Sequence, residues 1–74
     1  MSEEQLVYET TMALRGKQYQ ISVYCRAGGR HVAKTTLAED DIIINDGTSL
    51  EEVLAKHQKL LPLAVTLRRI FYHF

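Results

Sequence analysis

The side chains in this 74-residue sequence with the chemistry of a nucleophile or a soft metal ligand are few and scattered: Cys25, His31, His57 and His73. Structural zinc sites are usually marked by paired ligands such as C-x2-C, and these four residues show no paired spacing. We therefore expect neither a metal site nor a bound cofactor.

A catalytic role for Cys25 would require an adjacent cation or a helix N-terminus that activates the thiol. Cys25 instead continues the alternating apolar face of Ile21 and Val23, which predicts a small buried side chain. His57 falls on the apolar face of a predicted helix, where histidines pack more often than they catalyse. The sequence thus predicts no catalytic residue, and we expect a protein that is not an enzyme.

Two further motifs are turns rather than ligand sites. Glu39, Asp40 and Asp41 are consecutive acids without the spaced oxygen ligands and distal glutamate of a calcium loop. Gly28 and Gly29 lack the lysine and hydroxyl residues of a phosphate-binding loop, and no helix is predicted directly after them. Both stretches are typical of solvent-exposed turns.

A basic surface is the one feature that suggests a nucleic-acid partner, although the formal net charge is zero. Acids are missing from residues 15–34, where an aromatic residue also falls on the polar face of a predicted strand and could stack on a base. The candidate contacts are Arg15, Lys17, Tyr24, Arg26, Arg30 and Lys34. A nucleic-acid-binding module that uses this basic hairpin is the alternative hypothesis for function.

Alternating polar and apolar residues predict the elements that position these side chains. Strands are expected over residues 6–14, 18–25 and 30–37, with a brief buried strand at 42–44, and the glycine-containing turns between them favour an antiparallel meander of three to four strands. The third strand is the least apolar, so we expect it at an edge of the sheet.

A C-terminal helix is the strongest signal in the chain. Ser49 is the expected N-cap, with Glu52 reaching back in a capping box, and an apolar face recurs at helical spacing up to Leu61. This helix is the one amphipathic element available to cover the sheet. The sheet residues expected beneath it are Leu6, Tyr8, Met12, Ile21 and Val23.

Pro62 predicts that the helix is broken or kinked there, because proline cannot donate to the carbonyl four residues earlier. Residues 63–74 then read either as helix or as a final strand, and helical spacing favours the helix. Their apolar stripe faces a different direction from that of the first helical segment, so one small sheet cannot cover both. The expected self-association interface comprises Leu63, Leu67, Ile70, Phe71 and Phe74.

Composition sets the remaining expectations. The length fits one α+β domain spanning residues 1–74, and a single cysteine allows no intramolecular disulfide. The N-terminus has no signal-peptide pattern, and no apolar run approaches the roughly 20 residues that span a bilayer. We expect a cytoplasmic, non-enzymatic interaction module that forms a homo-oligomer and does not associate with a membrane. In that oligomer, Arg68 and Arg69 are expected to face acidic residues at 39–41 of a second copy.

Overall fold

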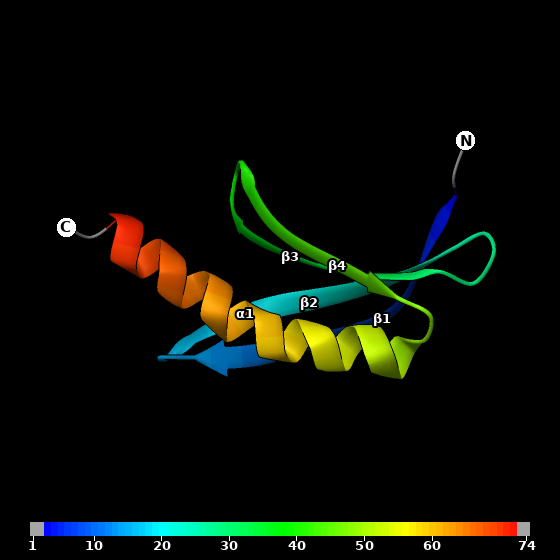
Figure 1. Ribbon diagram of the computed structural model, residues 1–74, viewed down its shortest axis with the longest axis horizontal. Helices are drawn as coiled ribbons and strands as arrows, with labels where there is room; N and C mark the ends of the chain where they lie inside the picture. The colour runs from blue at the N-terminus through cyan, green and yellow to red at the C-terminus, as the bar shows by residue number, and fades with distance from the viewer. Residues whose placement is uncertain (1–2, 73–74) are drawn as a thin grey trace.

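The computed structural model describes residues 3–72, with side chains described for residues 3–70. Within them, four antiparallel strands form one sheet in the order β1-β2-β3-β4, followed by one helix (Figure 1). The elements are β1 Glu4–Leu14, β2 Lys17–Arg26, β3 His31–Ala38, β4 Asp41–Gly47 and α1 Leu50–Tyr72. The predicted α+β class, an antiparallel meander packed against a C-terminal helix, is confirmed.

A tight turn fixes the register of the long β1–β2 hairpin. Arg15 and Gly16 both have positive φ, at 52° and 80°, as a two-residue type I′ turn requires. Leu14 pairs with Lys17 directly across this turn. From Lys17 onward, alternate residues of β2 therefore face α1.

β3 lies inside the sheet, between β2 and β4, so its predicted edge position is wrong. The edge position was predicted from the polar residues of this strand, but those residues have partners within the fold. Thr35 is buried and lies 2.7 Å from a ring nitrogen of His57. Lys34 pairs with Glu4 at 3.0 Å on the opposite face of the sheet. The edge strands are β1 and β4, and β4, with 7 residues, is longer than predicted.

A β-bulge in β1 overturns part of the predicted core face. The register shifts between Leu6 and Tyr8, so that Leu6 pairs with Tyr24 whereas Tyr8 pairs with Val23. Leu6 and Tyr8 therefore lie on opposite faces of the sheet, because one inserted residue inverts the alternation. They are 49% and 41% exposed, so their predicted burial under the helix is wrong.

The hydrophobic core lies between the sheet and α1, which packs chiefly against β4 and β3 (Figure 1). Burial of apolar surface here, at about 25 cal/mol per Å², is the main term that stabilises the fold. The core residues are Ile21, Val23, Ala33, Ile43, Val53, Leu61 and Ala64. Ile21 and Val23 are thus buried as predicted, and Met12 packs at the border of this cluster.

The start of α1 confirms the predicted cap. The Glu52 backbone N–H donates to the Ser49 hydroxyl oxygen at 3.1 Å. The Glu52 carboxylate reaches one residue further back than in a standard capping box, where it accepts from the Thr48 amide at 3.1 Å and the Thr48 hydroxyl at 2.6 Å. The Thr48 side chain, Lys56 and the Thr48 amide together lower the pKa of Glu52 to about 2.

α1 runs as one helix from Leu50 to Tyr72 with Pro62 inside it. The preferred helical reading of the tail is therefore confirmed as far as residue 72, and the helix is not broken at Pro62. Among the described residues, no helical stretch is both long and apolar enough to pass through a bilayer.

Candidate functional site

The second half of α1 exposes a row of large apolar side chains, which we call the apolar stripe: Leu60, Leu63, Leu67 and Ile70. Successive members are three, four and three residues apart, so they follow one line along the helix. Leu63 is the most exposed of them at 64%, and each of the others is more than a third exposed. The stripe lies roughly a quarter turn around the helix from the buried face that packs on the sheet.

Three of the five predicted interface residues, Leu63, Leu67 and Ile70, belong to this stripe. The side chain of Phe71 and the whole of Phe74 lie outside the described residues. Leu60 was not predicted as part of this surface, because it precedes Pro62, where a break between two helical segments was expected. Its spacing of three residues from Leu63 was the available signal.

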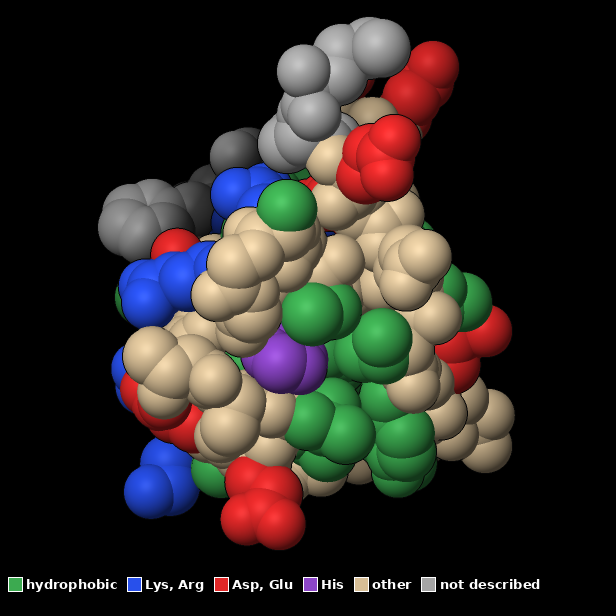
Figure 2. Space-filling view, turned by 90° about the vertical axis from the view of Figure 1, so that its right-hand side faces the viewer, with side chains coloured by type: hydrophobic (Ala, Val, Ile, Leu, Met, Phe, Trp, Pro, Cys, Tyr) green, Lys and Arg blue, Asp and Glu red, His purple; other side chains and the backbone are tan. Residues whose placement is uncertain are grey.

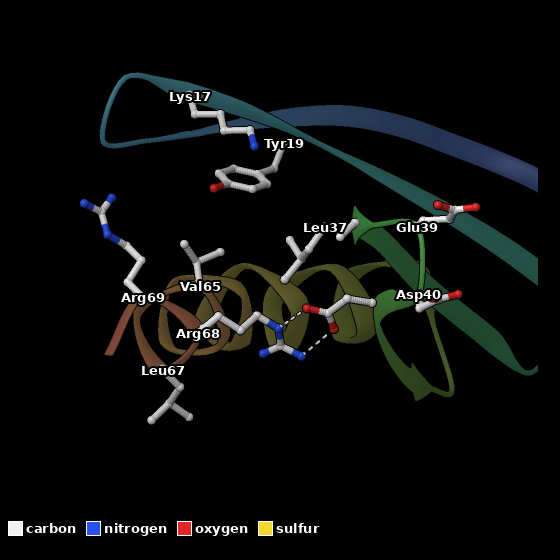
Figure 3. A pocket seen from close by; sticks show the side chains of 11 residues that line it. Lys17, Tyr19, Leu37, Glu39, Asp40, Val65, Leu67, Arg68 and Arg69 are labelled. Atoms are coloured by element: carbon white, nitrogen blue, oxygen red, sulfur yellow. Dashed lines mark hydrogen bonds and ion pairs between the residues drawn. The ribbon is translucent and has the colours of Figure 1, made fainter. Parts of the chain in front are cut away.

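A cleft of about 910 Å³ opens on another side of the second half of α1. Its walls come from β2, the end of β3, the β3–β4 turn and α1. Val65 points towards Tyr19 and Leu37, whereas Leu67, which borders the cleft, directs its side chain away (Figure 3). The cleft and the apolar stripe are therefore separate surfaces of the same helical segment.

Arg68 ties the second half of α1 to the start of β4. Its Nη2 donates to Asp41 Oδ1 at 2.8 Å, and its Nε donates to the other carboxylate oxygen (Figure 3). Its Nη1 donates to the Ala64 carbonyl at 3.0 Å. This fork holds the pKa of Asp41 below its usual value through the hydrogen bonds from Arg68. Arg68 thus meets an acid of its own chain, where we had expected one from a second copy.

His57 is fully buried, and both of its ring nitrogens have partners. Asn45 donates its amide to the Val53 carbonyl at 3.1 Å, which leaves its Oδ1 to accept from His57 Nδ1. His57 Nε2 then accepts from the Thr35 hydroxyl at 2.7 Å. This network holds a neutral imidazole, and burial lowers the pKa of His57. None of the three side chains in this network lines the cleft, so we assign the network a structural role.

Cys25 is only partly buried, contrary to the prediction, and it lies directly opposite His31 in the β2–β3 ladder. At the end of the molecule where α1 begins, hydrophobic side chains lie beside one surface histidine (Figure 2). His31 is the described histidine that reaches the surface, and its Nδ1 lies 2.9 Å from the Gly29 carbonyl. Within residues 3–72, no three acids, histidines or cysteines gather as a metal site.

Two of the basic residues proposed for nucleic-acid contact are held by one acid on the face of the sheet that α1 leaves open. Glu4 accepts from Arg26 at 2.6 Å and from Lys34 at 3.0 Å. The Lys34 ammonium also lies 4.8 Å from the centre of the Tyr24 ring. These contacts reduce the charge available to a phosphate backbone.

The rest of the predicted basic set is divided between the two ends of the sheet. Arg30, at the β2–β3 turn, pairs with Asp46 at 3.1 Å. Arg15 lies in the β1–β2 turn at the other end, and Lys17 directly follows this turn. The structure therefore does not bring the six residues together on one surface, and a nucleic-acid interface stays a prediction.

A scan of protein-family models, a search of curated proteins and a search of solved structures each find no match to this chain.

Proposed function

We propose that this protein is a non-enzymatic interaction module that associates with a second copy of itself in the cytoplasm through the apolar stripe of α1. The observation that carries this proposal is the exposure of Leu60, Leu63, Leu67 and Ile70 along one line of the helix. Contiguous apolar patches on small soluble domains usually mark interfaces.

The spacing of the stripe supports a second copy as its partner. Alternating steps of three and four residues are the spacing of the seam between two packed helices. A two-fold axis near residue 65 would place Leu63 against the partner's Leu67 and Leu60 against the partner's Ile70. The same surface then covers itself, and no other chain is needed.

The charges beside the stripe favour an antiparallel over a parallel arrangement. Lys56 is paired with Glu52 at 2.9 Å, and Arg68 is paired with Asp41. Lys59, which lies beside the stripe, has no acidic partner among the described residues. A parallel pair would place each Lys59 beside its copy, and like charges repel. In the antiparallel arrangement Lys59 lies opposite position 71 instead. We also propose that Pro62 kinks the helix within the stripe.

The test is the solution mass of the wild type, Leu63→Glu and the control Gln58→Glu, measured by sedimentation equilibrium from micromolar to millimolar concentration. Gln58 is exposed on the side of α1 away from the stripe. We expect the wild type and the control to form dimers as concentration rises. Leu63→Glu should stay monomeric yet fold, because its side chain is largely exposed in the single chain. A wild type that is monomeric at every concentration would contradict self-association.

A further inference from the structure

The two hairpins of the sheet separate at one end. β2 and β3 pair from Ser22↔Lys34 to Cys25↔His31, although β2 begins at Lys17 and β3 continues to Ala38. Residues 17–21 stay paired with β1, and residues 35–38 stay next to β4. Two strand edges therefore diverge without pairing with each other (Figure 1). Residues of both strands and of α1 line the cleft.

Alternate backbone groups along residues 17–21 face the side of β2 on which β3 pairs further along the strand. Arg26 donates its N–H to the Arg30 carbonyl, towards the β3 side of the strand. Backbone groups of alternate residues in a strand point to the same side, so those of Gln20 and Gln18 also point towards β3. β3 does not reach them, because its ladder with β2 ends at Ser22. Residues 17–21 thus offer an edge of about five residues, or roughly 17 Å at the rise of a strand.

The charged side chains of the cleft are divided between its two ends: Glu39, Asp40 and Asp41 lie at the β3–β4 turn, and cations lie at the other end (Figure 3). Lys17 comes from β2 and Arg69 from α1, and Figure 3 shows both on the side near the β1–β2 turn. Among the described residues, neither has an acidic partner, although the Lys17 ammonium lies 5.4 Å from the Tyr19 ring centre. A carboxylate between these cations would gain charge-assisted hydrogen bonds from both walls.

The inner part of the cleft is apolar. The Tyr19 ring, Leu37 and Val65 converge there from three different elements (Figure 3). All three are partly buried and pack against the core, so they are fixed in place before any ligand arrives. They would accept one apolar side chain that lies two residues from an acid on the same face of a strand.

We propose that the cleft binds an extended, acidic peptide segment of a partner protein, which adds as a strand to the β2 edge. Main-chain hydrogen bonds to residues 18 and 20 supply affinity, and specificity comes from an acid held by Lys17 and Arg69 beside an apolar residue in the inner cleft. This proposal does not rest on self-association, because the apolar stripe faces away from the cleft.

The first experiment selects displayed random seven-residue peptides against the immobilised full chain. We expect enriched sequences that combine an acid with a β-branched or aromatic residue two positions away. The best synthetic peptide, labelled with fluorescein, is then titrated with the wild type, with a double variant of the two cleft cations and with a control variant. Lys17→Glu combined with Arg69→Glu should weaken binding at least tenfold, whereas the control Lys59→Glu, outside the cleft, should bind within twofold of wild type. Circular dichroism verifies that each variant is folded.

The second experiment tests strand addition directly, by methylating single backbone nitrogens of the bound peptide. If the peptide pairs along one edge of β2, methylating every second backbone nitrogen of the peptide should abolish binding. Methylating the nitrogens between them should change binding little. Failure to enrich any sequence, binding that survives the double charge reversal, or sensitivity without alternation would each overturn the proposal. A lower solution mass of the Lys17→Glu, Arg69→Glu variant than of the wild type, both without peptide, would also overturn the proposal. The cleft would then be occupied by a second copy of this chain.

Discussion

The two halves of α1 belong to one helix but are held in different ways. Residues 50–61 begin at the Ser49 cap and place Val53, His57 and Leu61 in the core. Residues 62–72 bury Ala64, rely on the Arg68 contact with Asp41, and expose most of the apolar stripe. Tertiary packing supplies most helical stability in proteins. The first half is therefore determined by the fold itself, whereas the second presents large apolar groups that the single chain leaves uncovered.

The largest expected effect comes from truncating one leucine in each half. Leu61→Ala opens a cavity in a fully buried position and should cost about 2 to 5 kcal/mol of unfolding free energy. Leu63→Ala removes an exposed side chain and should change the stability of the monomer by less than about 0.5 kcal/mol. Urea unfolding at low micromolar concentration measures both. Equal losses would show that the two halves are not held differently.

Acidification provides a second, smaller test, directed at the first half alone. Because burial lowers the pKa of His57 below its usual 6.5, the unfolded chain takes up this proton before the folded chain does. The unfolding free energy should therefore fall as pH drops below about 6.5, with a slope of at most about 1.4 kcal/mol per pH unit.

Urea titrations between pH 7 and pH 5 measure this slope, and His57→Gln should flatten it. The carboxylates Glu4, Asp41 and Glu52 have lowered pKa values and ordinary values of 3.8 to 4.5. Their contribution is present above those ordinary values and is lost only at lower pH, outside the measured window. A slope that persists in His57→Gln would assign the effect to another group.

Local patterns predicted most of the fold, and the misses share a physical cause. The cap at Ser49, the β2 core face and the C-terminal helix depend on neighbours in sequence, so the sequence alone revealed them. The bulge between Leu6 and Tyr8 inverts the alternation without a local signal. The interior place of β3 depends on long-range partners of its polar residues, such as Glu4 for Lys34.

The same division applies to the candidate surfaces. The stripe could be predicted in large part, because helical spacing places Leu63, Leu67 and Ile70 on one line. The cleft could not, because it exists only where two hairpins diverge beyond Ser22 and Lys34. The residues that line the cleft come from segments far apart in the sequence, so no local sequence pattern predicts it.

The smallest expected effect concerns the contact between Arg68 and Asp41, which holds the second half of α1 to the sheet. Asp41→Asn removes the charge that accepts the Arg68 fork but keeps the shape of the side chain. Partly exposed ion pairs contribute little to global stability, so the unfolding midpoint should fall only slightly. Local opening should respond more, since Ala64 is the one buried side chain described among residues 62–70. Hydrogen exchange should therefore accelerate at the backbone amides of residues 65–70 and remain unchanged at residues 54–60.

The control is Glu39→Gln, a matched loss of one carboxylate charge in the β3–β4 turn, where Glu39 has no ion-pair partner among the described residues. It should leave exchange in both halves of α1 as in the wild type. Acceleration in Asp41→Asn that extends equally into residues 54–60 would mean that α1 opens as one unit. The exposed second half would then be held by the core through helix continuity rather than by Arg68, and the contrast between the halves would be confined to their surfaces.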